Sequence, residues 1–174
     1  DNYEAGCLAG KAALDMDEEE INIGIVNFDA TTENGQSREK GFRDTVGKDK
    51  RAVIVDTINV NSTIDSAKEE AEKLLERIPE INVVVTFNEW TSLGVGYAVK
   101  EAGLADSVRV VAFDSNVVSV DMLETGEVDA LIVQNPYAMG YQTMWAAIQS
   151  TAPKKETKIE KKVLLDPAWI DAEN

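Results

Sequence analysis

The stretch INVVVTFNEWTSLGVGYAVKEAGLADSVRVVAF, residues 81–113, contains a complete strand–helix–strand unit. Residues 81–85 and 108–112 are short apolar runs rich in valine, and such runs predict buried β-strands. Residues 89–102 between them read as a helix that ends at Gly103, because glycine is favoured just after a helix. Two buried strands joined through a helix indicate parallel pairing, since a parallel connection needs a long crossover.

The same alternation continues on both sides of this unit. Upstream we expect helices at 3–15, 36–46 and 64–78 and strands at 21–26 and 52–55; downstream we expect a short helix ended by Gly126, a strand at 130–133, a helix that begins at Pro136 and a last strand at 159–165. Strands that are apolar throughout, separated by amphipathic helices, predict an α/β fold. We therefore expect a doubly wound parallel sheet in a three-layer α/β/α arrangement.

Composition excludes several classes of function. The 174 residues are 44% hydrophobic, enough for one domain with a real core, and the formal net charge is −15. Nucleic-acid binding needs clustered Lys and Arg, so this charge argues against direct contact with DNA or RNA. The chain has no histidine, which excludes hydrolase triads and zinc sites built on that residue. Cys7 is the single cysteine, so no disulfide forms within the chain.

No nucleophile–base pair and no cofactor-binding loop stands out in the sequence. The segment Ser92–Tyr97 contains two glycines, but it falls inside a predicted helix and lacks the third glycine of a phosphate loop. We therefore expect a protein that is not an enzyme and that needs neither a metal nor a cofactor.

Polar and aromatic side chains follow nearly every predicted strand. They are Asn27 and Phe28 after the first, Asp56, Thr57, Asn59 and Asn61 after the second, Phe87, Asn88 and Glu89 after the third, Phe113, Asp114, Ser115 and Asn116 after the fourth, and Gln134 and Asn135 after the fifth. Doubly wound sheets bind ligands at these carboxyl ends. Carboxylates, amides and aromatic rings suit a neutral polyhydroxylated ligand. Polar residues also crowd loops and helix caps, so this pattern alone leaves both interpretations open.

Five segments resemble, in order, the second lobe of type I periplasmic sugar-binding proteins, and ribose-binding-like members most of all. They are Asp1-Asn2 with Gly6 and Ala9-Gly10, Arg38-Glu39-Lys40-Gly41-Phe42, Phe87-Asn88-Glu89 with Leu93-Gly94, Val110-Val111-Ala112-Phe113-Asp114, and Gln134-Asn135-Pro136-Tyr137-Ala138-Met139-Gly140-Tyr141. The resemblance implies that residues 1–134 form the second, C-terminal sugar-binding lobe. It also implies that residues 135–174 are the return through the hinge, with a helix that belongs to the first lobe and a final strand and tail.

The resemblance implies a set of ligand residues as well: Arg38, Asn88, Phe113, Asp114 and Gln134. Ser62 or Asn61 stands where relatives use an aromatic residue, so the resemblance does not imply ribose itself. Ala112 replaces a glycine that is usual in the family, which is a minor change.

The implied function is that of the solute-binding component of an ABC-type sugar importer. Two lobes would close on a small neutral sugar or polyol and present it to a membrane permease. The protein would be periplasmic or extracellular, with a lipid anchor left open. The alternative is the sugar-effector domain of a lac-repressor-like transcription regulator, which shares this fold.

We expect this chain to be part of a longer protein, because most of the first lobe is absent. The helix that begins at Pro136 carries Tyr137, Tyr141, Met144 and Ile148 as an apolar stripe. Without a first lobe to cover it, the stripe should promote self-association or fold back onto the sheet of its own lobe.

Overall fold

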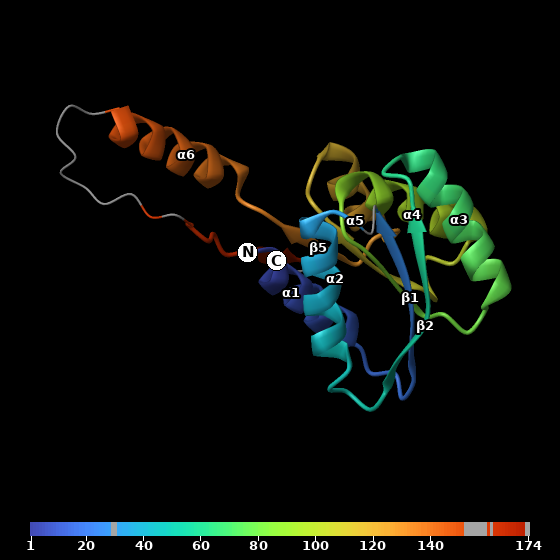
Figure 1. Cartoon of the computed structure of the whole chain (residues 1–174). Helices are drawn as coiled ribbons and strands as arrows, with labels where there is room; N and C mark the ends of the chain where they lie inside the picture. Colours follow the sequence, from blue (N-terminus) through green and yellow to red (C-terminus); the bar gives the residue numbers. More distant parts are fainter. Residues whose placement is uncertain (29–30, 152–159, 161, 173–174) are drawn as a thin grey trace.

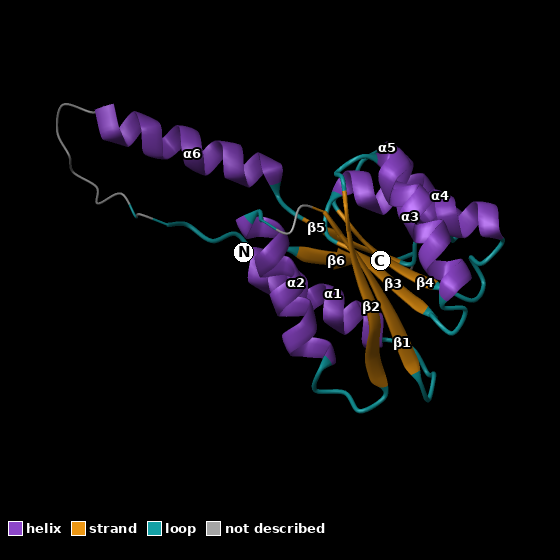
Figure 2. Cartoon of the chain, turned by 45° about the vertical axis from the view of Figure 1, so that its right-hand side comes forward, coloured by secondary structure: helices purple, strands orange, loops and turns teal. Residues whose placement is uncertain are grey.

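The computed structural model describes residues 1–28, 31–151, 160 and 162–172. A central sheet carries helices on both faces (Figures 1 and 2). Its six strands are β1 (Ile21–Phe28), β2 (Ala52–Val60), β3 (Val83–Thr86), β4 (Arg109–Phe113), β5 (Ala130–Val133) and β6 (Ala168–Ile170). The helices are α1 (Asn2–Leu14), α2 (Glu33–Val46), α3 (Ile64–Arg77), α4 (Glu89–Ala102), α5 (Val117–Thr125) and α6 (Pro136–Thr151).

The strand order is β2-β1-β3-β4-β5-β6, with β1 to β5 all parallel. The predicted doubly wound α/β sheet is therefore confirmed. The last strand differs from the expectation, because β6 is short and runs antiparallel to β5, with Val133 paired to Ala168.

The prediction of a strand at 159–165 is wrong. Residues 160 and 162–165 are not in a strand, and residues 159 and 161 lie outside the described residues. The carbonyl of Leu165 instead accepts a hydrogen bond from the amino terminus of Asp1, at 2.9 Å. The strand forms further on, where Trp169 pairs with Ile132 and packs against the buried core of one face. Contact of a large ring with the core favours pairing at this position.

Each face of the sheet buries its own cluster of apolar side chains. Helices α1 and α2 cover one face, and α3, α4 and α5 cover the other (Figure 2). On the first face the rings of Phe42, Phe87 and Phe113 are fully buried and form two edge-to-face pairs, with ring centroids 5.9 and 5.6 Å apart. These rings form a packed aromatic cluster near the carboxyl ends of β3 and β4.

Helices α1 and α2 approach each other closely because two glycines face the contact. A Cβ on Gly6 would lie 1.9 Å from the carbonyl oxygen of Arg38, and one on Gly41 would lie 2.1 Å from that of Tyr3. No side chain fits in such a gap. The pair of glycines therefore sets where α2 lies, and with it the position of Arg38.

Side chains cap the starts of several helices, and the two predicted glycines end α4 and α5. The side chains of Asp1 and Thr63 accept hydrogen bonds from backbone N–H groups at the start of α1 and α3. Gly103 and Gly126 end α4 and α5 with positive φ of 66° and 84°. Helices α3 to α5 all begin at the carboxyl edge of the sheet, so their N-caps lie beside the strand ends.

Helix α6 stands away from the sheet and its helical layers (Figure 1). None of its residues is buried, and Tyr137, Tyr141, Met144 and Ile148 are 82%, 60%, 63% and 58% exposed. The alternative in which this helix folds back onto its own sheet is therefore not what the structure shows. Within the described part of the chain, no helix combines the length and apolar character needed to cross a bilayer.

Candidate functional site

Arg38 lies under the carboxyl edge of the sheet with only 4% of its surface exposed. Its Nη1 donates to the Phe87 carbonyl at 2.6 Å, and its Nε donates to Asn2 Oδ1 at 3.1 Å. The guanidinium also lies 4.9 Å from the centre of the Phe113 ring. Burial lowers the pKa of Arg38, and the negative charge of Asp114 opposes that shift. The side chain is thus held rigidly, with its Nη2 without a partner among the described residues.

Asp114 and Gln134 form the second part of the site. Asp114 follows β4 with φ of 65°, a left-handed conformation that Asp and Asn tolerate better than most residues. Its backbone N–H donates to the Ile132 carbonyl at 2.9 Å, which extends the pairing with β5. Gln134 Nε2 then donates to Asp114 Oδ1 at 2.6 Å. This leaves the carboxylate oxygen Oδ2 and the amide oxygen of Gln134 as acceptors at the edge of the sheet.

Asn88 follows β3 and is the N-cap of α4. Its Oδ1 accepts from the backbone N–H of Thr91 at 3.0 Å, and the Thr91 hydroxyl lies 2.7 Å away. Its Nδ2 donates to the hydroxyl of Ser62 at 2.6 Å. The amide is therefore locked by the cap, and one N–H of Nδ2 remains for another acceptor.

Phe113, the fifth residue implied by the resemblance, is fully buried. It lies beneath Arg38 and beside Phe87, so in this structure it supports the site from below.

A cavity of about 300 Å³ opens above these strand ends. It is lined by Glu89, Asp114, Ser115, Gln134, Pro136 and Met139. Glu89 is a member that the implied ligand set omits, although it directly follows Asn88 in the sequence. Its Oε1 accepts from Asn116 Nδ2 at 2.7 Å, which fixes the carboxylate between the starts of α4 and α5. Of the five residues implied by the resemblance, Asp114 and Gln134 line this cavity, whereas Arg38, Asn88 and Phe113 do not. The cavity therefore brings together the carboxylates of Glu89 and Asp114.

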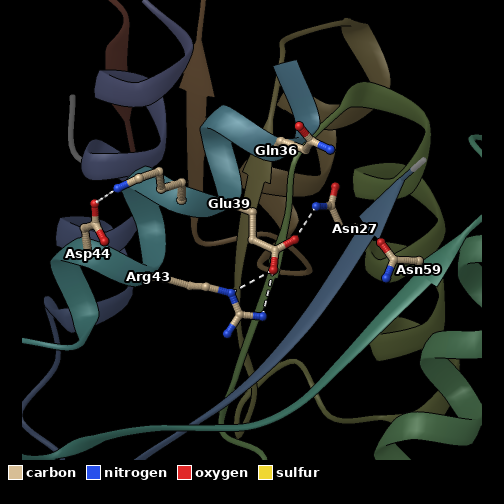
Figure 3. Close-up of a pocket in the computed structure, with 7 residues that line it drawn as sticks. Asn27, Gln36, Glu39, Arg43, Asp44 and Asn59 are labelled. Carbon is tan, nitrogen blue, oxygen red and sulfur yellow. Dashed lines mark hydrogen bonds and ion pairs between the residues drawn. The ribbon is translucent and has the colours of Figure 1, made fainter. Parts of the chain in front are cut away.

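A second groove, of about 430 Å³, lies between α2 and the neighbouring strands β1 and β2 (Figure 3). Glu39 accepts from Asn27 Nδ2 at 2.5 Å and pairs with Arg43 at 2.7 Å, while Lys40 pairs with Asp44. The charged groups of the groove thus neutralise one another. None of the five residues implied by the resemblance lines it, so the cavity next to Asp114 is the better candidate site.

Among the described residues, no three His, Cys, Asp or Glu side chains are grouped so that they could hold a metal ion. The chemistry that the site offers is hydrogen bonding by fixed donors and acceptors.

The family model of the periplasmic binding protein domain matches residues 1–155. The chain belongs to this family. Its α/β fold with a mostly parallel six-stranded sheet is that of a lobe of a type I periplasmic binding protein, in agreement with the resemblance found in the sequence.

Curated relatives in the periplasmic binding protein family are named as sugar-binding proteins. The chain is 28% identical over 159 residues to the D-ribose/D-allose-binding protein of Pseudomonas aeruginosa, covering 90% of this chain and 50% of that protein. It is 24% identical over 162 residues to the D-allose-binding periplasmic protein of Escherichia coli, covering 92% and 52%. The chain therefore spans about half the length of the curated relatives it matches.

Solved structures of periplasmic binding proteins share the fold. GanP, a glucose-galactose binding protein from Geobacillus stearothermophilus, matches with a TM-score of 0.88 and 27% identity, over 100% of this chain and 61% of that chain. A carbohydrate transporter solute binding protein from Agrobacterium radiobacter, in complex with D-arabinose, matches with a TM-score of 0.91 and 26% identity, over 100% and 60%.

Proposed function

We propose that this chain is the second lobe of a two-lobed sugar-binding protein that serves an ABC-type importer. Its strand-end site would hold a small neutral sugar or polyol through Arg38, Asn88, Asp114 and Gln134. The observation that carries the proposal is the Asp114–Gln134 hydrogen bond at the cavity, together with a buried Arg38 whose pKa the charge of Asp114 influences.

The free hydrogen-bonding groups of this site divide into two sets. Arg38 Nη2 and the second N–H of Asn88 are donors, while Asp114 Oδ2 and Gln134 Oε1 are acceptors. A hydroxyl group both donates and accepts, so neighbouring hydroxyls of a sugar can bridge the two sets. A ligand without hydroxyls would leave one set unpaired, which costs binding energy.

The charges around the cavity favour a neutral ligand. Asp114 and Glu89 both line it, and Arg38 supplies the one positive charge that we assign to the site. A sugar phosphate or sugar acid would bring a further negative charge close to two carboxylates and lose its hydration. This charge balance supports neutral sugars and polyols over anionic ones.

The relatives named above support the uptake function over the transcription regulator, since their names refer to sugar binding in the periplasm or to a carbohydrate transporter. By this proposal the lobes close on the sugar through a hinge motion, and the closed form is presented to a membrane permease outside the cytoplasmic membrane. The domain boundary would then lie near Gln134, with α6 packed on the first lobe.

The proposal is tested by titrating the two-lobed protein with D-allose, D-ribose and D-arabinose in a calorimeter. We expect at least one of them to bind with micromolar affinity or better, and glucose 6-phosphate not to bind. Binding should survive treatment with a chelator, because the proposed contacts are hydrogen bonds from protein side chains and include no metal. A protein that binds none of the sugars, or that loses sugar binding with the chelator, would contradict the proposal.

A further inference from the structure

Glu89 places a second carboxylate in the cavity above the strand ends. It is the first residue of α4 and lines the cavity together with Asp114 and Gln134. Its Oε1 accepts from Asn116 Nδ2 at 2.7 Å, which fixes the position of the carboxylate. Its Oε2 has no hydrogen-bond partner among the residues that the structure describes. One charged oxygen in a fixed position therefore remains for another donor.

The polar part of the cavity lining offers acceptors in particular. Asp114 keeps Oδ2, Gln134 keeps Oε1 and Glu89 keeps Oε2, and these groups follow the neighbouring strands β4, β5 and β3. Among the described residues that line the cavity, none is Lys or Arg. The donors for these three oxygens must therefore come from the ligand or from water.

The same cavity also has an apolar part. Pro136 and Met139, from the start of α6, complete the lining next to Gln134. A sugar ring presents hydroxyl groups that can donate and C–H groups that can contact apolar atoms. Such a ligand satisfies both kinds of lining in one cavity.

We propose that Glu89 is a specificity-determining residue of this site and accepts a hydrogen bond from one hydroxyl group of the ligand. The inference rests on the proposed function and adds to it the chemistry that the cavity selects, because the substituent next to Glu89 has to be a donor. A sugar with hydrogen or fluorine at that position leaves a charged oxygen without a partner when the lobes close.

The competing explanation is that Glu89 serves only the fold. As the first residue of α4 it suits the positive end of the helix dipole, and its bond to Asn116 joins the starts of α4 and α5. The two explanations differ in one measurable respect. A supporting role weakens all sugars by the same factor, whereas direct contact weakens only those sugars that carry the recognised hydroxyl group.

The experiment is a calorimetric titration of the two-lobed protein with whichever of D-allose, D-ribose and D-arabinose binds best. Each monodeoxyfluoro analogue of that sugar is titrated as well, because fluorine replaces one hydroxyl group and cannot donate. Wild type is compared with Glu89→Gln, which keeps an oxygen for Asn116 Nδ2 and removes the charge.

Two further variants separate contact from support. Asn116→Ser keeps a side-chain oxygen that can cap α5 and removes only the bond to Glu89. Glu124→Gln is the matched control, because Glu124 is exposed on α5 and does not line the cavity.

We expect Glu89→Gln to weaken binding of the parent sugar about 10- to 100-fold, the value of one hydrogen bond to a charged group. Glu124→Gln should stay within about twofold of wild type, less than the loss of one neutral hydrogen bond. Asn116→Ser should weaken binding less than Glu89→Gln, because the charged acceptor remains. For one monodeoxyfluoro analogue, wild type and Glu89→Gln should bind equally.

Three results would overturn the inference and leave the proposed function intact. They are wild-type affinity of Glu89→Gln for the parent sugar, equal weakening of this variant for the parent and every analogue, and an Asn116→Ser variant that binds as weakly as Glu89→Gln. The last two would assign Glu89 a structural role. A wild-type protein that binds none of the sugars would instead refute the proposed function, and the inference with it.

Discussion

Replacing Asp114 by Asn tests the centre of the candidate site. The substitution keeps the size of the side chain and suits the left-handed backbone at φ of 65°, which Asn adopts readily. Ala would add a conformational cost, because it lacks the short polar side chain whose local hydrogen bonds let Asp and Asn adopt this conformation. Oδ1 is already bonded to Gln134 Nε2 at 2.6 Å, and this bond survives in the variant. The change therefore acts on the group that faces the ligand.

The magnitude follows from what is lost. The carboxylate oxygen Oδ2 becomes an amide NH₂, so an acceptor that carries charge is replaced by a donor. A hydrogen bond to a charged group contributes about 1.5–3 kcal/mol. At about 1.4 kcal/mol for each factor of ten, Asp114→Asn should weaken sugar binding about 10- to 100-fold. The fold should be retained, because Asp114 lies at the edge of the sheet.

The assay is a calorimetric titration of the two-lobed protein, accompanied by thermal unfolding. Asp121→Asn is the control, because Asp121 is an exposed residue of α5 and this substitution removes the same charge at a position away from the cavity. It should bind sugar like wild type. Wild-type affinity in Asp114→Asn, at an unchanged unfolding temperature, would refute the assignment of Asp114 to the site.

Three further predictions concern stability and assembly. In urea unfolding, Gly41→Ala should destabilise the fold by about 2–3 kcal/mol, because its Cβ would lie 2.1 Å from a backbone oxygen. Gly140→Ala, whose Cβ would have nothing within 4 Å, should instead stabilise α6 by about 0.5–1 kcal/mol. Similar changes in the free energy of unfolding for both variants would contradict the packing described. Burial raises the pKa of Asp129, so its ionisation costs folded-state stability as the pH rises from about 4 through the raised pKa. The stability of Asp129→Asn relative to wild type should therefore be greater at pH 7 than at pH 3.5, and a difference that does not vary with pH would count against it. The 174-residue chain alone should self-associate through the exposed apolar residues of α6 and bind sugar poorly. The double variant Tyr141→Lys with Met144→Lys should be monomeric in light scattering. A wild-type chain that stays monomeric and binds sugar with the affinity of the two-lobed protein would contradict this prediction.

The order of elements could be predicted from the sequence because it depends on local patterns. Apolar runs define β1 to β5, and Gly103 and Gly126 end the helices where expected. The strand at 159–165 was wrong because an apolar run carries no information about its pairing partner. In the described residues β6 forms where Trp169 pairs with Ile132 and packs against the buried core of one face, contacts that no local pattern encodes.

The sequence predicts where the residues of the candidate site lie along the strands, but not which side chains contact one another. Asp114 and Asn88 follow neighbouring strands, and the rule for parallel sheets places them at one edge. The hydrogen bond between Ser62 and Asn88 joins residues 26 positions apart. It depends on the strand order, which no local pattern encodes. The burial of Phe113 beneath Arg38 likewise follows from the close approach of α1 and α2, which is a property of the packed fold.

The pairing of Val133 with Ala168 makes residues 134–167 an insertion between two adjacent, antiparallel strands. The chain leaves the sheet and re-enters it at neighbouring points, where a tight hairpin turn would ordinarily suffice. The segment between β5 and β6, which includes α6, thus takes no part in the hydrogen bonds that pair these two strands. The entropic cost of closing such a loop grows only slowly with its length, so connecting segments of very different length are compatible with the same sheet. The edge of the sheet formed by β5 and β6 can therefore accommodate connections of different length without a change in its strand pairing.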